Sequence, residues 1–230
     1  MDSIPATSTK KKSRSIFHEL LMGFGIILKT KYFYIALIIL AFGIQLNFAS
    51  QTYLHNYIME GKTLPMLSDL ILDNIPFINV SFFYDFFAMT ALVIMMIYVV
   101  HKNEYNRIPF FLLLFGIFYV VRGVFIVMTP FGNPPLFEGS NSPFKGFSKY
   151  DLGVYPSGHM GNVVLMVLLT KDKIYKILLF ICLCLIVISL FLAHGHYSID
   201  IFSGLFFGYA IKSFGEKYFT MFEIRPGSDP

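Results

Sequence analysis

The sequence predicts an all-α integral membrane protein, built as a bundle of six transmembrane helices. Of its 230 residues, 56% are hydrophobic and only 14% are charged, and the mean hydropathy is +0.65. A soluble domain carries more charge than this. Apolar runs recur along the chain at close to the roughly 20 residues that a helix needs to cross a bilayer. They lie at residues 33–53, 82–100, 108–128, 157–170, 175–194 and 199–214.

The apolar runs also define the domain organisation. Residues 1–32 are predicted to be a cytoplasmic tail with an interfacial helix at 16–29, where apolar residues recur at helical spacing. Residues 33–214 are predicted to form a six-helix membrane domain, and residues 215–230 a short cytoplasmic tail. We expect no cleaved signal peptide, because the first apolar run is long and follows a polar, basic segment.

Lysine and arginine are unequally distributed between the two ends of the predicted spans. Fourteen lie in the two termini and in the 102–107 and 171–176 turns, whereas the opposite loops hold three. Because basic loops remain in the cytoplasm, both termini are predicted to be cytoplasmic. The other end then faces the extracytoplasmic or lumenal side of a bacterial inner membrane or a eukaryotic Golgi or plasma membrane. The net charge of +4 is explained by this topology and does not indicate nucleic acid binding.

Two histidine segments occur at this outer end. His196 and Asp200 are four residues apart where the last span begins, so they share one helix face. The carboxylate can hold one ring nitrogen and leave the other as a nucleophile. Taken alone, the pair also fits an interfacial histidine beside a helix-capping aspartate.

The second histidine segment is Pro-Ser-Gly-His at 156–159. Ser157 is a favourable N-cap, Gly158 lets the backbone approach a ligand, and the first N–H groups of the helix can bind an anion. His159 is placed to protonate a leaving alkoxide and then to deprotonate an incoming hydroxyl. An ordinary helix cap is the alternative, but two such segments at one membrane depth favour phosphoryl transfer through histidine.

Arg122 lies inside the third predicted span. An arginine in the hydrocarbon core costs at least ~2.5 kcal/mol, so we expect an anionic partner. A guanidinium suits bidentate phosphate binding, and snorkelling or an ion pair with Asp69, Asp73 or Asp85 is the alternative. Tyr119, one turn away on the same face, either orients Arg122 or simply packs.

Other polar residues at the outer end offer weaker indications. Asp69 is a candidate contact for a headgroup amine, with a solvated loop face as the alternative. His194 raises the idea of a zinc site, but His194 and His196 would point to different helix faces and no metal-ligand spacing is evident. We therefore expect no metal and no cofactor. The loop at 129–155 is long for a compact protein, which is typical of functional loops.

Together these segments resemble the type 2 phosphatidic acid phosphatase (PAP2) superfamily, and within it the sphingomyelin synthase-like branch. Met-Leu-Ser-Asp at 66–69 is similar to that branch's Pro-Leu-Pro-Asp motif, with two substitutions. Tyr-x-x-Arg at 119–122, followed by Thr-Pro at 129–130, is similar to the second motif. Ser-Gly-His at 157–159 matches the core of the third. His-Tyr-Ser-Ile-Asp at 196–200 is similar to the fourth, which normally reads His-Tyr-Thr-x-Asp.

The resemblance implies a PAP2-like helical bundle with an exoplasmic active site and a triad of His159, His196 and Asp200. By this resemblance, His196 attacks the phosphorus of a glycerophospholipid headgroup ester while His159 protonates the departing diacylglycerol. His159 then activates the hydroxyl of a ceramide-like acceptor, and no metal takes part. The expected partners are therefore membrane lipids, a glycerophospholipid donor and a ceramide or diacylglycerol acceptor.

The chain departs from both branches of the family. The synthase branch's Cys-Gly-Asp before the third motif is absent, with Asp151 and Gly153 nearby but out of register. Pro156 is what the broader phosphatase group carries, yet that group's Lys-x6-Arg-Pro motif is missing and its Ser-Arg is Ser189-Leu190 here. We predict a lipid phosphotransferase that works through a phosphohistidine. The alternatives are a PAP2-type lipid phosphate phosphatase or phospholipase C-like hydrolase with the same residues, and a non-catalytic lipid-binding membrane protein.

Overall fold

The computed structural model describes residues 23, 25, 27–139 and 150–224, and every regular element within them is helical. The predicted all-α fold class is therefore confirmed for this part of the chain. The long helices are α2 (Lys31–Met59), α3 (Ser81–His101), α4 (Ile108–Met128), α5 (Gly158–Leu169), α6 (Lys173–Leu192) and α7 (Ser198–Tyr218). Short 3-10 turns are η1 (Leu72–Asn74), η2 (Glu104–Arg107) and η3 (Thr220–Phe222).

Local sequence signals explain where several of these helices begin. α4 has Pro109 in its first turn, where a missing N–H costs nothing. α6 follows Asp172, whose carboxylate accepts the backbone N–H of Ile174 at 3.0 Å. α5 follows Ser157, whose hydroxyl accepts the backbone N–H of Met160. Such caps satisfy N–H groups that have no partner inside the helix. The N-cap predicted at Ser157 is thus confirmed.

Each predicted span coincides with a helix, and α4 has the predicted bounds. α2 differs most, because it continues to Met59 and not only to residue 53. Within the described residues, four helical segments are long and apolar enough to cross a membrane: α2, α3, α4 with η2, and α6. The count of six spans stays a prediction. The predicted interfacial helix at 16–29 lies largely outside the described residues.

The two remaining helices depart from a simple span for different reasons. α5 has 12 residues, about 18 Å of helix, and it packs against α3, α4, α6 and α7. A helix enclosed in this way does not need the length of a lipid-facing span. α7 has 21 residues, which is long enough to span a membrane, but its sequence is less apolar than that of the other long helices. Its apolar side chains Phe202, Leu205 and Phe206 lie on the outer surface of the bundle.

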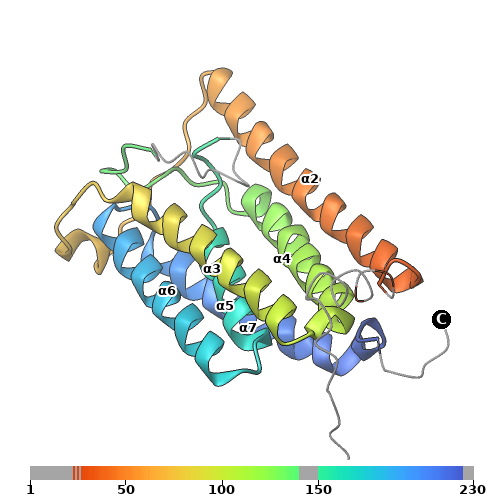
Figure 1. The fold of residues 1–230 in the computed structure, drawn as a ribbon. Helices are drawn as coiled ribbons and strands as arrows, with labels where there is room; N and C mark the ends of the chain where they lie inside the picture. Colours follow the sequence, from red (N-terminus) through yellow and green to blue (C-terminus); the bar gives the residue numbers. More distant parts are fainter. Residues whose placement is uncertain (1–22, 24, 26, 140–149, 225–230) are drawn as a thin grey trace, which may run out of the picture.

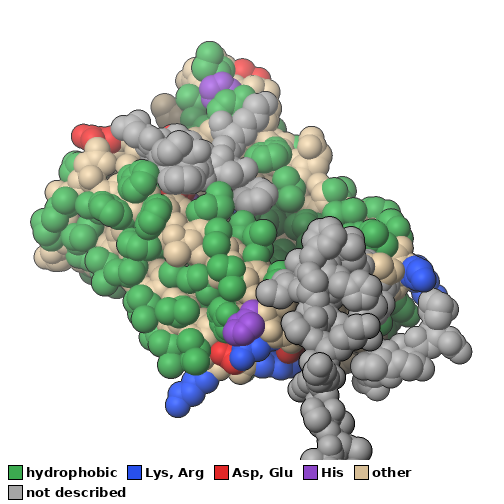
Figure 2. Space-filling model, viewed as in Figure 1, with side chains coloured by type: hydrophobic (Ala, Val, Ile, Leu, Met, Phe, Trp, Pro, Cys, Tyr) green, Lys and Arg blue, Asp and Glu red, His purple; other side chains and the backbone are tan. Residues whose placement is uncertain are grey.

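The outer surface of the bundle is apolar. Large exposed hydrophobic side chains line α2, α3, α6 and α7, and Figure 2 shows such side chains covering the flank of the molecule. A soluble monomer rarely exposes so large a continuous apolar surface. The surface and the long apolar helices therefore indicate an integral membrane protein.

The helices pack mainly in pairs. α2 lies along α4, α3 along α6 and α5 along α7 (Figure 1). At the α2–α4 contact, a Cβ atom on Gly43 would lie 2.5 Å from the carbonyl oxygen of Gly116, so only glycine permits this approach. Small residues give helices in lipid such close packing. α3 and α4 are consecutive in the chain, but they are not one of the closely packed pairs.

Basic side chains gather at one end of the bundle, the lower end in Figure 2. Lys102 pairs there with Asp172, and Arg107 pairs with Glu223, each at 2.8 Å. The histidine segments lie at the opposite end, where α5 and α7 begin. Which side of the membrane each end faces stays a prediction from the charge distribution.

Candidate active site

His196 and Asp200 lie where the chain leaves α6 and enters α7. His196 is 5% exposed, and Asp200, in the first turn of α7, is fully buried. The Nδ1 atom of His196 is 3.3 Å from Oδ2 of Asp200, which also accepts the backbone N–H of Tyr197 at 2.9 Å. The predicted contact between the imidazole and the carboxylate is present, but the two residues do not share a helix face, because His196 precedes the start of α7. The contact leaves Nε2 as the ring nitrogen away from Asp200.

Burial lowers the pKa of His196 below its ordinary value of 6.5, although the hydrogen bond and charge of Asp200 act in the opposite direction. The imidazole therefore stays neutral to pH values below 6.5. A neutral ring retains the lone pair that a nucleophile requires.

His159, in the first turn of α5, pairs with Asp85 of α3. The Nε2 atom of His159 is 2.8 Å from Oδ1 of Asp85, and the ring packs edge-on against Tyr84. From the sequence, Asp85 was expected only as a possible partner for Arg122 and not as a site residue. One signal was available, because Asp85 is the only charged residue in the apolar run at 82–100. A carboxylate inside a span usually has a functional partner.

The two histidines face each other because the starts of α5 and α7 are held together. The ring centroids of His159 and His196 are 6.1 Å apart. The backbone N–H of Ser157 donates to the carbonyl oxygen of Asp200 at 3.1 Å. A Cβ atom on Gly204 of α7 would lie 2.9 Å from the carbonyl oxygen of Ser157, so the close approach of the two helices depends on this glycine.

Arg122 donates hydrogen bonds to three neutral oxygens. Its Nε binds the carbonyl oxygen of Pro156 at 3.0 Å, its Nη2 binds that of Gly153 at 2.8 Å, and its Nη1 binds Oδ1 of Asn47. These bonds use three of the five N–H groups of a guanidinium. A Cβ atom on Gly158 would lie 3.1 Å from Nε of Arg122. Arg122 therefore binds the segment 153–156, which leads into α5. Its guanidinium also lies next to Gly158, the residue before His159.

The ion pair considered from the sequence for Arg122, with Asp69, Asp73 or Asp85, does not match these contacts. Asp85 pairs with His159, and Asp69 accepts both the backbone N–H and the hydroxyl of Ser198 at the start of α7. Burial alone would raise the pKa of Asp69, but hydrogen bonds from Ser198 and from the backbone of Leu72 and Ile71 lower it. Asp69 is thus buried against the start of α7 and does not lie on a solvated loop face.

Tyr119 lies on α4 one turn from Arg122, as expected. Its hydroxyl accepts a hydrogen bond from Nδ2 of Asn162 on α5 at 2.8 Å, so it links two helices that line the same cavity. Asn162 was not predicted as a site residue, although its position one turn after His159 is a signal present in the sequence.

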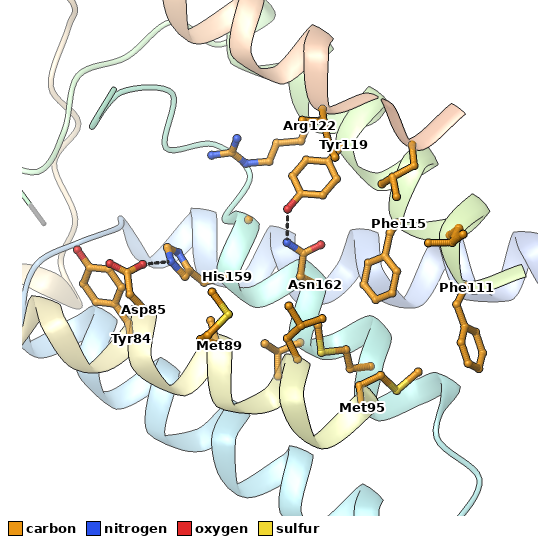
Figure 3. Close-up of a pocket in the computed structure, with 18 of the residues that line it drawn as sticks. Tyr84, Asp85, Met89, Met95, Phe111, Phe115, Tyr119, Arg122, His159 and Asn162 are labelled. Carbon is orange, nitrogen blue, oxygen red and sulfur yellow. Dashed lines mark hydrogen bonds and ion pairs between the residues drawn. The ribbon is translucent and has the colours of Figure 1, made fainter. Parts of the chain in front are cut away.

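A cavity of about 520 Å³ extends from these residues into the bundle between α3, α4 and α5. Asp85, His159, His196 and Arg122 line one end of it. In Figure 3, Asp85 and His159 lie at one end, and Met95 and Phe111 lie toward the other. The volume is in the range of about 300–1,000 Å³ that is usual for small-molecule sites.

His194 does not join the other histidines. Its Nε2 lies 3.0 Å from the carbonyl oxygen of Ile75, which holds the ring against the first outer loop. Within the described residues, no group of three or more His, Cys, Asp or Glu side chains could hold a metal ion.

Residues 154–216 match the family described as PAP2 superfamily C-terminal. A search of the curated proteins found no match. The matched segment contains His159, His196 and Asp200, whereas Asp85 and Arg122 lie outside it. The match does not distinguish the sphingomyelin synthase-like branch from the rest of the superfamily. Residues 154–216 are therefore similar to the C-terminal part of the PAP2 superfamily, whose members are usually phosphatases or phosphotransferases.

Proposed function

We propose that the protein transfers a phosphoryl headgroup from a glycerophospholipid to the hydroxyl of a ceramide-like lipid, through a phosphohistidine at His196. The observation that carries this proposal is the 6.1 Å spacing of the His159 and His196 rings at the polar end of an apolar cavity. At this spacing one phosphate ester can contact both rings while the rest of the lipid lies among apolar side chains.

In the first half-reaction, Nε2 of His196 attacks the phosphorus and forms a P–N bond as the P–O bond to diacylglycerol breaks. Protonated His159 gives its proton to the departing alkoxide. Asp200 orients His196 through Nδ1–H and offsets the positive charge that develops on that ring. Arg122, beside the start of α5, contacts the phosphate oxygens with its remaining N–H groups.

In the second half-reaction, neutral His159 takes the proton from the acceptor hydroxyl. The acceptor oxygen attacks the phosphorus and the P–N bond breaks. His196 returns to its neutral form, and His159 is protonated again and ready for the next donor lipid. Asp85 keeps the His159 ring in one orientation and balances its charge through both steps.

Hydrolysis is the second candidate function, because water can replace the lipid hydroxyl without any change of residues. The match at residues 154–216 is compatible with either reaction, whereas Pro156 ahead of Ser157, where the chain resembles the broader phosphatase group, favours hydrolysis. The apolar lining deeper in the cavity favours transfer instead, because it can hold the hydrocarbon portion of a lipid acceptor next to the reacting centre.

Product analysis separates the two functions. The purified protein in liposomes is given labelled phosphatidylcholine, phosphatidylethanolamine or phosphatidic acid, with and without ceramide, and the lipids are separated by chromatography. A phosphosphingolipid that forms only with ceramide, together with diacylglycerol, supports transfer. Diacylglycerol with free phosphate or a free phosphorylated headgroup, regardless of ceramide, means hydrolysis. His196→Ala and Asp200→Asn should abolish either activity in a folded protein, and near-full activity of either variant contradicts the mechanism.

A further inference from the structure

One face of α3 lines the cavity along most of the helix. The lining positions recur at 84–85, 88–89, 92, 95–96 and 99–100, which is the repeat of one helix face. α4 presents a second stripe at 108, 111–112, 115, 119 and 122. The two helices are not closely packed on each other, and the surface in Figure 2 is hollowed between them.

The cavity is deep relative to a lipid leaflet. From Asp85, beside His159, to Val99 the stripe on α3 descends about 21 Å at 1.5 Å per residue. Half of the hydrocarbon core of a bilayer is about 15 Å. The cavity therefore continues past the depth that a chain in one leaflet normally reaches. Tyr105 of η2 and Ile108 at the start of α4 lie at this deep end.

The chemistry of the lining changes with depth. Charged and polar side chains occur around the histidines, and Asn162 is the last of them along α5. Beyond it the lining consists of Leu, Ile, Val, Met and Phe, with Tyr105 at the far end. Methionine and long aliphatic side chains adapt to a flexible apolar ligand. A phosphate ester at the histidines would therefore have its hydrocarbon portion directly below it.

We propose that this cavity holds an acyl chain of the substrate lipid and that Val99, at its deep end, limits the length of chain that fits. This inference rests on the proposed function, because it places the rest of the same substrate. A chain gains little hydrophobic free energy by leaving a bilayer that is as apolar as the lining. Selection between chains must therefore come from available space, since a chain that meets a bulky wall is excluded.

The test compares two substitutions on one helix. Val99→Trp narrows the deep end, whereas Val93→Trp adds the same side chain to a position that is 49% exposed and outside the lining. Turnover is measured with dihexanoyl and dipalmitoyl forms of the same phospholipid. We expect Val99→Trp to lower the palmitoyl-to-hexanoyl activity ratio at least about tenfold, because overpacking a filled site is unfavourable. Val93→Trp should leave the ratio as in the unmodified protein, and an unchanged ratio in Val99→Trp overturns the inference.

A milder variant and a binding measurement keep the test independent of folding and of activity. Val99→Phe should shift the ratio in the same direction if Val99→Trp does not fold. A phospholipid with a diazirine at the end of one acyl chain is also crosslinked to the unmodified protein, and the adducts are mapped by mass spectrometry. Adducts at residues 95–108 support the chain site whether or not the lipid is turned over. Such adducts in a protein that turns over no lipid would overturn the proposed function and leave the chain site supported. Adducts confined to bilayer-facing residues of α6 and α7 overturn the chain site.

Discussion

The Nε2 atom of His159 lies 2.8 Å from Oδ1 of Asp85, and this contact joins α5 to α3 across the mouth of the cavity. The carboxylate is 7% exposed, so water screens its charge poorly. The candidate site therefore contains two histidine–carboxylate pairs of similar design. The aspartate of His196 lies four residues later in the chain, in the first turn of α7, whereas the aspartate of His159 comes from α3.

We predict that Asp85→Asn lowers kcat by about tenfold to a hundredfold, less than the loss for His159→Ala, because a general acid–base residue contributes about 10²–10⁴-fold. The asparagine keeps the size of the side chain but cannot balance the charge of His159. Asp85→Glu should recover part of kcat, and KM should change little in both variants. Steady-state kinetics in detergent micelles provide the measurement. A variant that raises KM and leaves kcat intact would assign Asp85 to substrate binding instead.

Arg122→Lys should weaken the binding of the lipid substrate and lower the stability of the protein. A lysine presents a single ammonium and cannot reach three oxygens arranged around a planar fork. We expect a higher KM together with a lower melting temperature, followed by circular dichroism because the chain has no tryptophan. Asn47→Ala is the matched control, because it removes one of the same contacts but lies outside the cavity lining. If Asn47→Ala reproduces the whole kinetic defect, Arg122 acts through the loop and not on the phosphate.

The pH dependence of the reaction should reflect the lowered pKa of His196. Because the nucleophile must be neutral, activity should persist as the pH falls to 6.5 and decline only below it. The same shift in pKa affects stability. Between pH 6.5 and the lower pKa that His196 has in the folded protein, the imidazole binds a proton more readily in the unfolded chain than in the folded one. The free energy of unfolding should therefore decrease as the pH falls through that window. The pH profile of kcat/KM is the measurement, and an acid limb centred at or above pH 6.5 would contradict a buried neutral nucleophile.

Asp69→Asn should mainly affect stability. The carboxylate accepts two hydrogen bonds from Ser198, and loss of a helix-capping side chain costs about 1 kcal/mol. We expect a lower melting temperature with KM nearly unchanged. Asp73→Asn, an exposed residue in the same loop, is the control and should change neither quantity. A tenfold rise in KM without a change in melting temperature would instead support the headgroup contact proposed from the sequence.

The features that the sequence predicted well are local ones. The positions of the six helices follow from apolar runs, the N-cap at Ser157 from the residue that precedes a run, and the His196–Asp200 contact from a four-residue spacing. Each depends on neighbours within one or two helical turns. Helix periodicity and the capping of helix starts determine such relationships, so a single sequence is sufficient to predict them.

The sequence by itself determined that the chain forms apolar helices and that two histidine segments begin two of them. Only the tertiary structure decided that Asp85 meets His159, 74 positions away, and that Asp69 meets Ser198, 129 positions away. The partners of Arg122 could not be predicted from the sequence either, because they include backbone carbonyl groups. Every residue carries such a group, so the sequence does not indicate which of them Arg122 contacts. Which of these groups come together depends on how the helices pack, and that packing arises from the summed contacts of side chains far apart in the chain.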